Sequence, residues 1–148
     1  MSSSGASALL AFAAGVAGAT QIAVQGRLGG RVGTVEAVAT AAVVGTTIAL
    51  VTLLVVRGSL RGIADAAGGP KWQLLGGVAS VFIVLSITVA GPRIGVVATT
   101  AFVIAAQLSM ATIIDRYGWF GLEAVPVAWP RVLGIVLLFA GAALTLRR

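Results

Sequence analysis

The sequence contains no cysteine and no histidine, and only 9% of its 148 residues are charged. Without cysteine the chain has no disulfide, thiol nucleophile or thiolate ligand, and without histidine it has no imidazole ligand or proton relay. It also lacks a hydrolase nucleophile elbow, a phosphate-binding loop and a pair of close carboxylates. We therefore expect no enzyme, no catalytic residue, no metal and no cofactor.

Apolar residues fill the chain instead, at 59% of the sequence with a mean hydropathy of +1.09. A soluble domain is about half apolar and about a quarter charged, so a chain this short could not hide so much apolar surface from water. Ala, Val, Leu and Gly predominate without strand-like alternation, which favours helices over a barrel. The sequence predicts an all-α integral membrane protein.

Five apolar runs are each long enough to cross a bilayer as a helix. They lie near residues 6–25, 34–56, 72–90, 94–114 and 131–146, within one transmembrane domain over 1–148. The first run follows a segment without positive charge, so we expect a retained span rather than a cleaved signal peptide. The connections at 26–33, 57–71, 91–93 and 115–130 are expected to be loops. Aromatic residues gather at the span ends, as in an interfacial belt: Trp72, Tyr117, Trp119 and Trp129.

The net charge of +6 comes from basic residues between the apolar runs, where they anchor helices, so we expect no nucleic-acid partner. Five spans put five basic residues on each side of the membrane. One side holds Arg57, Arg61, Lys71, Arg116 and Arg131, and the other holds Arg27, Arg31, Arg93, Arg147 and Arg148. Three interpretations are open: the count is blurred at the span edges, the first helix alone sets the orientation, or copies of the chain insert both ways. We favour the last, in which two antiparallel chains form an inverted repeat.

Two glutamines, Gln21 and Gln25, lie four residues apart near the end of the first run and so share a helix face. In a membrane such amides either bond neighbouring helices together or line a polar cavity. We favour the cavity, because two amides on one face exceed what helix association needs.

In the second run Glu36 and Thr40 share a face with Thr47. An acid inside a membrane is a functional candidate by default, here for substrate binding or proton coupling. Two other interpretations stay open. Glu36 could favour the positive end of its own helix, or it could pair with Arg27 or Arg31.

The fourth run carries Thr100 and Gln107, seven residues apart on one face, and Gln107 adds a third amide at membrane depth. At its end we expect Asp115 to form a local ion pair or a solvated cap. In the last run Gly134 and Gly141 predict a packing face for a neighbouring helix or a partner chain.

The stretch ATQIAVQGRLGGRVG at residues 19–33 resembles the opening motif of the half-size, five-helix (YdcZ-like) branch of the drug/metabolite transporter superfamily. Four later stretches fit in order and extend the resemblance over nearly the whole chain: GTTIALVTLLVVRGSLRG, WQLLGGVASVFIVLSITVAGPRIG, FVIAAQLSMATIIDRYGWFG and RVLGIVLLFAGAAL. The resemblance implies a transporter of two oppositely oriented five-helix halves. By position, Gln21, Gln25 and Gln107 match the amides of the family. Glu36 departs from it, because that position is usually small and apolar there.

The chain also lacks the first-helix glutamate of the related small multidrug resistance proteins, so drug/proton exchange through that residue is not implied. We expect a secondary transporter of a small polar or organic-cation metabolite or drug, in the inner or plasma membrane of a bacterial cell. It would work by alternating access as an antiparallel dual-topology homodimer. The substrate would bind near the midplane at Gln21, Gln25, Glu36, Thr40, Thr100 and Gln107. The alternatives are a dual-topology passive channel and a membrane interaction protein without transport.

Overall fold

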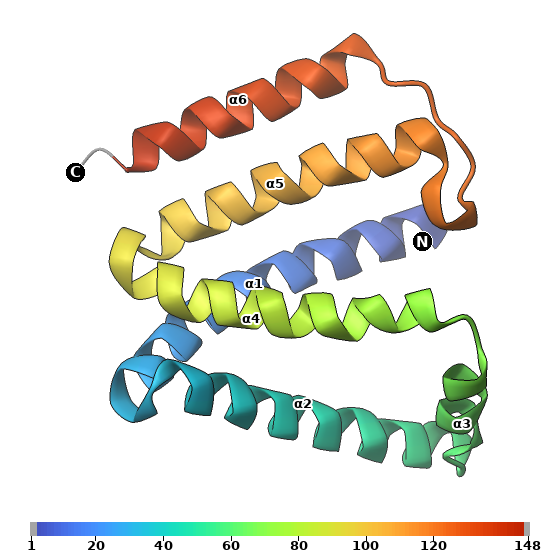
Figure 1. The fold of residues 1–148 in the computed structure, drawn as a ribbon. Helices are drawn as coiled ribbons and strands as arrows, with labels where there is room; N and C mark the ends of the chain where they lie inside the picture. Colours follow the sequence, from blue (N-terminus) through green and yellow to red (C-terminus); the bar gives the residue numbers. More distant parts are fainter. Residues whose placement is uncertain (1–2, 147–148) are drawn as a thin grey trace. The chain divides into compact units, whose positions relative to one another are not determined.

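The computed structural model describes residues 3–146, and helices run along most of that range (Figure 1). No strand occurs among these residues, which confirms the all-α expectation. The helices, in chain order, are α1 (Ser3–Val32), α2 (Thr34–Arg57), α3 (Arg61–Gly68), η1 (Lys71–Leu74), α4 (Leu75–Ile94), α5 (Val96–Tyr117), η2 (Trp119–Gly121) and α6 (Trp129–Thr145).

The five expected spans fall on α1, α2, α4, α5 and α6. The first four are long and apolar enough to cross a membrane, α4 being counted together with η1. Helix α6 is apolar but has 17 residues, which is the lower end of the spanning range of about 17–25 residues. The described part of the chain therefore contains four spans by length and composition, with α6 as a shorter fifth candidate.

The loops expected at 26–33 and 91–93 are wrong. Helix α1 continues to Val32, and α4 runs through residues 91–93 with Pro92 inside it. Only Gly33 and Gly95 lie outside the helices at these two turns. The physical reason is that a membrane offers no water to unpaired backbone groups, so a helix is favoured up to the last residue before the reversal. The segment 57–71 also differs from the expectation, because it contains the short helix α3.

Both one-residue turns use glycine in a conformation closed to other residues. Gly33 has φ 106° and ψ 151°, and Gly95 has φ 86° and ψ 159°. A side chain there would be strained, because this region is accessible almost only to glycine. Each turn glycine still donates its N–H to the carbonyl four residues earlier, Gly33 to Gly29 and Gly95 to Gly91, both at 3.0 Å. The helical hydrogen bonding thus continues into the turn.

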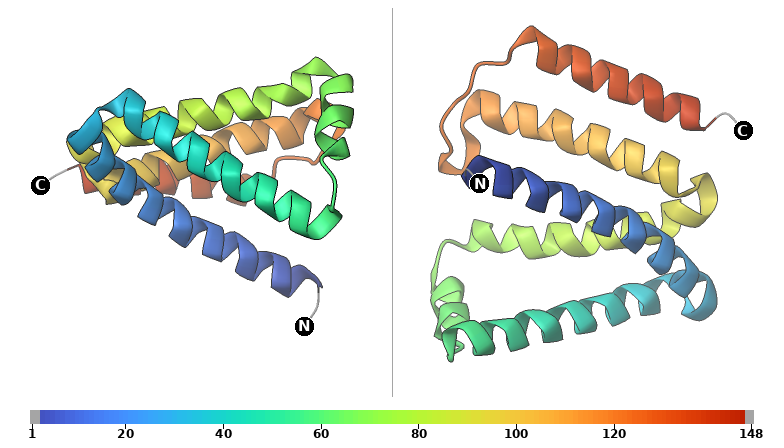
Figure 2. Two further views of the ribbon diagram at one scale, coloured as in Figure 1. Left: turned by 90° about the horizontal axis from the view of Figure 1, so that it is seen from below. Right: turned by 180° about the vertical axis from the view of Figure 1, so that it is seen from behind.

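The chain forms two compact units, which are described separately. One, the 24–90 unit, spans Val24–Ala90 and contains the end of α1, all of α2, α3 and η1, and most of α4. The other, the α5–α6 unit, combines the residues up to Ala23 with those from Gly91 onward. In it α5 and α6 run side by side in opposite directions (Figures 1 and 2). The single domain over 1–148 stays a prediction.

Large apolar side chains lie on the outside of the helices. Leu10 is 77% exposed and Val55 is 80% exposed, and buried alanines such as Ala37, Ala98 and Ala105 mark where helices approach closely. Exposed apolar area costs about 25 cal/mol per Å² in water, but nothing comparable in hydrocarbon. This surface is that of a membrane protein.

Candidate functional site

Gln25 in α1 is a buried amide without a partner. It is 4% exposed, and its Nε2 makes no hydrogen bond within the described residues. A buried donor left unsatisfied costs about 1–3 kcal/mol, and such groups are rare in native proteins unless water or a ligand satisfies them. Gln21, one turn earlier, is exposed. The two glutamines share a helix face by spacing, but only Gln25 is enclosed.

The burial of Gln25 accompanies close helix packing in the 24–90 unit. Gly29 lies one turn after Gln25 on the same face of α1. A Cβ on Gly29 would come within 2.7 Å of Thr88 Cγ2, so the missing side chain permits the close approach of α4. Thr88 is 2% exposed, and its hydroxyl donates to the Val84 carbonyl at 2.6 Å.

Thr88 is not among the site residues predicted from the sequence. One signal does point to its neighbourhood, because GPRIG at 91–95 repeats GGRVG at 29–33 with glycines at both ends and arginine in the middle. The repeat marks the end of α4 as a counterpart of the end of α1. From this repeat, polar residues just before GPRIG, such as Thr88, are site candidates as much as Gln25 just before GGRVG.

Glu36 lies in the first turn of α2 and is exposed. Its carboxylate folds back over the turn and occupies the space where a Cβ of Gly33 would lie. It makes no capping hydrogen bond, and no ion pair joins it to Arg27 or Arg31. A carboxylate at this end of a helix is stabilised by the helix dipole. The hydroxyl of Thr40 donates to the Glu36 backbone carbonyl at 2.7 Å and not to the carboxylate.

On α5, Thr100 is half-buried and its hydroxyl donates to the Val96 carbonyl at 2.8 Å. Gln107 is exposed, and its amide makes no hydrogen bond within residues 3–146. The adjacent Thr99 is 2% exposed and donates to the Gly95 carbonyl at 2.8 Å. Gln107 therefore has its full hydrogen-bonding capacity available.

The six candidate residues divide between the two units. Gln25, Glu36 and Thr40 belong to the 24–90 unit, where they flank the Gly33 turn. The α5–α6 unit contains Gln21, Thr100 and Gln107. All six remain predicted substrate contacts.

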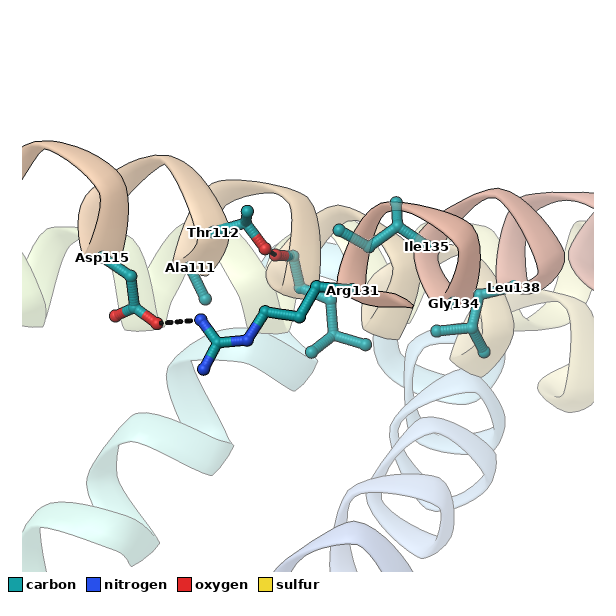
Figure 3. A pocket seen from close by; sticks show the side chains of 8 residues that line it. Ala111, Thr112, Asp115, Arg131, Gly134, Ile135 and Leu138 are labelled. Carbon is teal, nitrogen blue, oxygen red and sulfur yellow. Dashed lines mark hydrogen bonds and ion pairs between the residues drawn. The ribbon is translucent and has the colours of Figure 1, made fainter. Parts of the chain in front are cut away.

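An ion pair that the sequence did not predict lies in the α5–α6 unit. Arg131 Nη1, near the start of α6, donates to Asp115 Oδ2, near the end of α5, at 3.1 Å (Figure 3). The intervening loop is held by the Val125 N–H, which donates to the Asp115 carbonyl at 2.7 Å. The expectation for Asp115 was a local pair or a solvated cap, whereas its partner lies sixteen residues away.

A groove with a volume of about 560 Å³ adjoins this pair between α5 and α6. Its lining is mainly apolar and includes Leu108. Ala111, Gly134 and Leu138 also line it (Figure 3). Gly134 was expected to form a packing face, but among the described residues nothing packs against it, because a Cβ there would meet no atom within 4 Å, and it lines the open groove instead.

Nothing in the described range suits a resident metal. No group of three or more Asp, Glu, His or Cys side chains gathers there, and the sequence has neither of the two strongest ligand types. The candidate residues can donate and accept hydrogen bonds.

Long apolar helices with outward-facing apolar side chains define a multi-span helical membrane protein. Residues 6–144 match the family model described as "Putative inner membrane exporter, YdcZ", and the chain belongs to this family. The match confirms the resemblance seen in the five sequence stretches. It also assigns the protein to a class of membrane transporters, which are not enzymes. Neither the curated proteins nor the solved structures include a match to the chain.

Proposed function

We propose that the protein is one half of a secondary transporter that exports a small polar or organic-cation metabolite or drug. Two copies inserted in opposite orientations form the working unit and pass the substrate by alternating access across the inner membrane of a bacterium. The membership of an exporter family supports the transport class. The balance of five basic residues on either side of the predicted spans supports the antiparallel pair.

The observation that carries a substrate-binding role is the buried, unpartnered Nε2 of Gln25. A protein that needed this residue only for packing would do better with leucine, because an apolar side chain has no donor to leave unsatisfied. A transported solute with a hydrogen-bond acceptor would satisfy the amide only while it is bound. The proposed contacts are Gln21, Gln25, Glu36, Thr40, Thr100 and Gln107.

The test uses Gln25→Leu and follows both flux and stability. In proteoliposomes loaded with a mixture of small polar and cationic metabolites, the variant should export its substrate about tenfold less efficiently. In detergent the same variant should melt no lower than the wild type, because it removes an unsatisfied buried group. Gln73→Leu is the matched control, since Gln73 is an exposed glutamine in η1 outside the proposed site. Unchanged export by Gln25→Leu would remove Gln25 from the substrate site.

The antiparallel arrangement has its own test, which the absence of native cysteine makes simple. Single cysteines at Ser4 or at Thr145 are each labelled from outside the cell with a membrane-impermeant reagent. In a dual-topology pair, each position should be labelled to about half of the total, because half of the copies face each way. If one position is labelled fully and the other not at all, the dual-topology proposal is wrong.

Flux also separates a carrier from a passive channel. A carrier passes solute in conformational steps on the microsecond-to-millisecond scale or slower, so its export should saturate with substrate concentration. Export that rises linearly with concentration and requires no gradient of another ion would favour the channel.

A further inference from the structure

The groove between α5 and α6 has a charged end and an apolar body. At the charged end the Asp115–Arg131 pair is not enclosed, since the two side chains are 40% and 48% exposed. Along the rest of the groove Leu108, Ala111 and Leu138 present hydrocarbon, and Gly134 leaves the space open. A ligand that fits this groove needs a charged head and an apolar tail.

Each charge lies at a helix end whose dipole has the same sign, so its own helix does not neutralise it. Arg131 lies in the first turn of α6, whose N-terminus has no side-chain cap and is the positive end of the helix dipole. Asp115 lies in the last turn of α5, where the helix dipole is negative. The groove therefore offers a cationic and an anionic subsite side by side.

Both subsites keep hydrogen-bonding capacity after the ion pair has formed. The guanidinium of Arg131 carries five N–H donors, and only one, on Nη1, is engaged in the described residues. On Asp115 only Oδ2 accepts from it, which leaves Oδ1. The pair can thus bind a phosphate through arginine and an ammonium through the carboxylate without being broken.

We propose that this groove binds a phospholipid whose headgroup carries both a phosphate and a primary ammonium, the charge pattern of phosphatidylethanolamine. The phosphate contacts the Arg131 guanidinium, the ammonium donates to Asp115, and one acyl chain lies along Leu108, Ala111 and Leu138. The position fits a lipid, because the groove runs between α5, which is long and apolar enough to cross a membrane, and the shorter apolar helix α6. Its charged end also lies beside aromatic residues typical of headgroup depth, with Tyr117 stacked on Trp119 at a centroid distance of 5.9 Å.

The test measures lipid retained by the full chain after delipidation. The protein is exposed to mixed micelles that contain equal amounts of phosphatidylethanolamine, phosphatidylcholine and phosphatidylglycerol, and bound lipid is counted by native mass spectrometry. Phosphatidylethanolamine should be retained about tenfold over phosphatidylcholine, whose ammonium has no N–H to donate, because a charge-assisted hydrogen bond is lost. It should equally exceed phosphatidylglycerol, which has no ammonium.

Two glycines of α6 supply a matched pair of variants. Gly134→Leu fills the groove and should abolish the preference, whereas Gly141→Leu lies on the same helix outside it and should retain it. A Cβ meets no atom within 4 Å at either glycine, so both variants should fold. Arg131→Gln should also lose the preference while keeping its helical circular dichroism.

Three results would overturn the proposal. Equal retention of all three lipids would show that headgroups are not recognised, and preference for phosphatidylglycerol would show that only an anion is bound. Equal behaviour of Gly134→Leu and Gly141→Leu would show that the lipid binds elsewhere, for instance where a second copy of the chain packs. The assay measures bound lipid and not transport, so its result is independent of the proposed export function.

Discussion

The Gly33 turn and the Gly95 turn have the same backbone and different chemistry. In each turn one glycine leaves the helical conformation for the same glycine-only region of φ and ψ. In each, the N–H of that glycine donates to the carbonyl four residues earlier at 3.0 Å. The motifs GGRVGTVE at 29–36 and GPRIGVVA at 91–98 share both glycines, the arginine and a valine. Four positions differ, and the last is the one where a charge is present in one motif alone, with Glu36 in the first turn and Ala98 in the second.

The comparison of the two turns shows which residues the reversal of the chain requires and which are present in one turn only. The second turn forms with a buried alanine, Ala98, where the first has an exposed acid. A carboxylate is therefore dispensable for the reversal itself. Two roles for Glu36 therefore stand beside each other, the interaction with the dipole of α2 and the proposed one in substrate binding or coupling.

The largest effect should come from giving either turn glycine a side chain. Gly33→Ala and Gly95→Ala should each destabilise the protein by about 1–3 kcal/mol, because the glycine-only conformation becomes strained. Gly33→Ala should cost more than the strain alone, since its new Cβ must also displace the Glu36 carboxylate. Unfolding in a denaturing detergent series measures both.

A double variant sharpens this contrast. Glu36→Ala removes the carboxylate, so Gly33→Ala should cost less in the Glu36→Ala background than in the wild type. Gly95→Ala should cost the same in both backgrounds, because Glu36 belongs to the other turn. Equal costs for Gly33→Ala with and without Glu36 would contradict the packing of the carboxylate over the turn.

The next effect concerns the first glycine of each motif, where helices approach closely. Gly29→Ala would bring a Cβ within 2.7 Å of Thr88 Cγ2, and Gly91→Ala would bring one within 2.9 Å of Ile22 Cγ2. Overpacking of this kind costs about 1–3 kcal/mol, partly offset by about 1 kcal/mol of improved helix propensity. Thermal unfolding in detergent should show both variants below the wild type.

A rescue variant assigns the clash to one methyl group. Thr88→Ser removes Cγ2, so it should restore Gly29→Ala while leaving Gly91→Ala unrescued. The open glycine Gly15 is the propensity control, because a Cβ there meets nothing within 4 Å and Gly15→Ala should not destabilise. If Gly29→Ala is as harmless as Gly15→Ala, the close approach of α1 and α4 is wrong.

The spans and the family were predictable from the sequence, because both depend on local hydropathy and on motifs along the chain. The turns were misread for a physical reason. Glycine and arginine mark loops in water, whereas in a membrane the segments 26–32 and 91–94 stay helical to keep their backbone paired. A comparison of the two motifs would have placed the break at the shared final glycine.

The candidate site was less predictable, because burial depends on which helices cross. Spacing puts Gln21 and Gln25 on one face, but the approach that Gly29 allows and the burial of Gln25 are nonlocal. The Asp115–Arg131 pair forms because the loop after α5 reverses the chain, so that α6 packs beside α5. No periodicity within either helix reveals which charge meets which.

Replacing Glu36, the acid that the second turn lacks, should have a smaller effect on stability. Glu36→Gln should cost about 0.3–1 kcal/mol, since the carboxylate interacts with the positive end of α2 at an exposed position, and added salt should reduce the cost. If Glu36 couples export to protons, the same variant should lose export driven by a pH gradient. Unchanged pH-driven export would leave Glu36 with the dipole role alone.

The smallest effect on stability should come from the threonines that follow the two turns. Thr40 and Thr100 both donate to the carbonyl four residues earlier in their own helix, at 2.7 and 2.8 Å, and neither hydroxyl joins two helices. Thr40→Val and Thr100→Val should therefore change the free energy of unfolding by less than about 0.5 kcal/mol. Because these hydroxyls have lone pairs left to accept a hydrogen bond, a substrate contact would appear as a higher KM for export without loss of protein. A variant that unfolds more easily instead would mean that its hydroxyl serves the fold, and one with wild-type stability and KM would remove that threonine from the site.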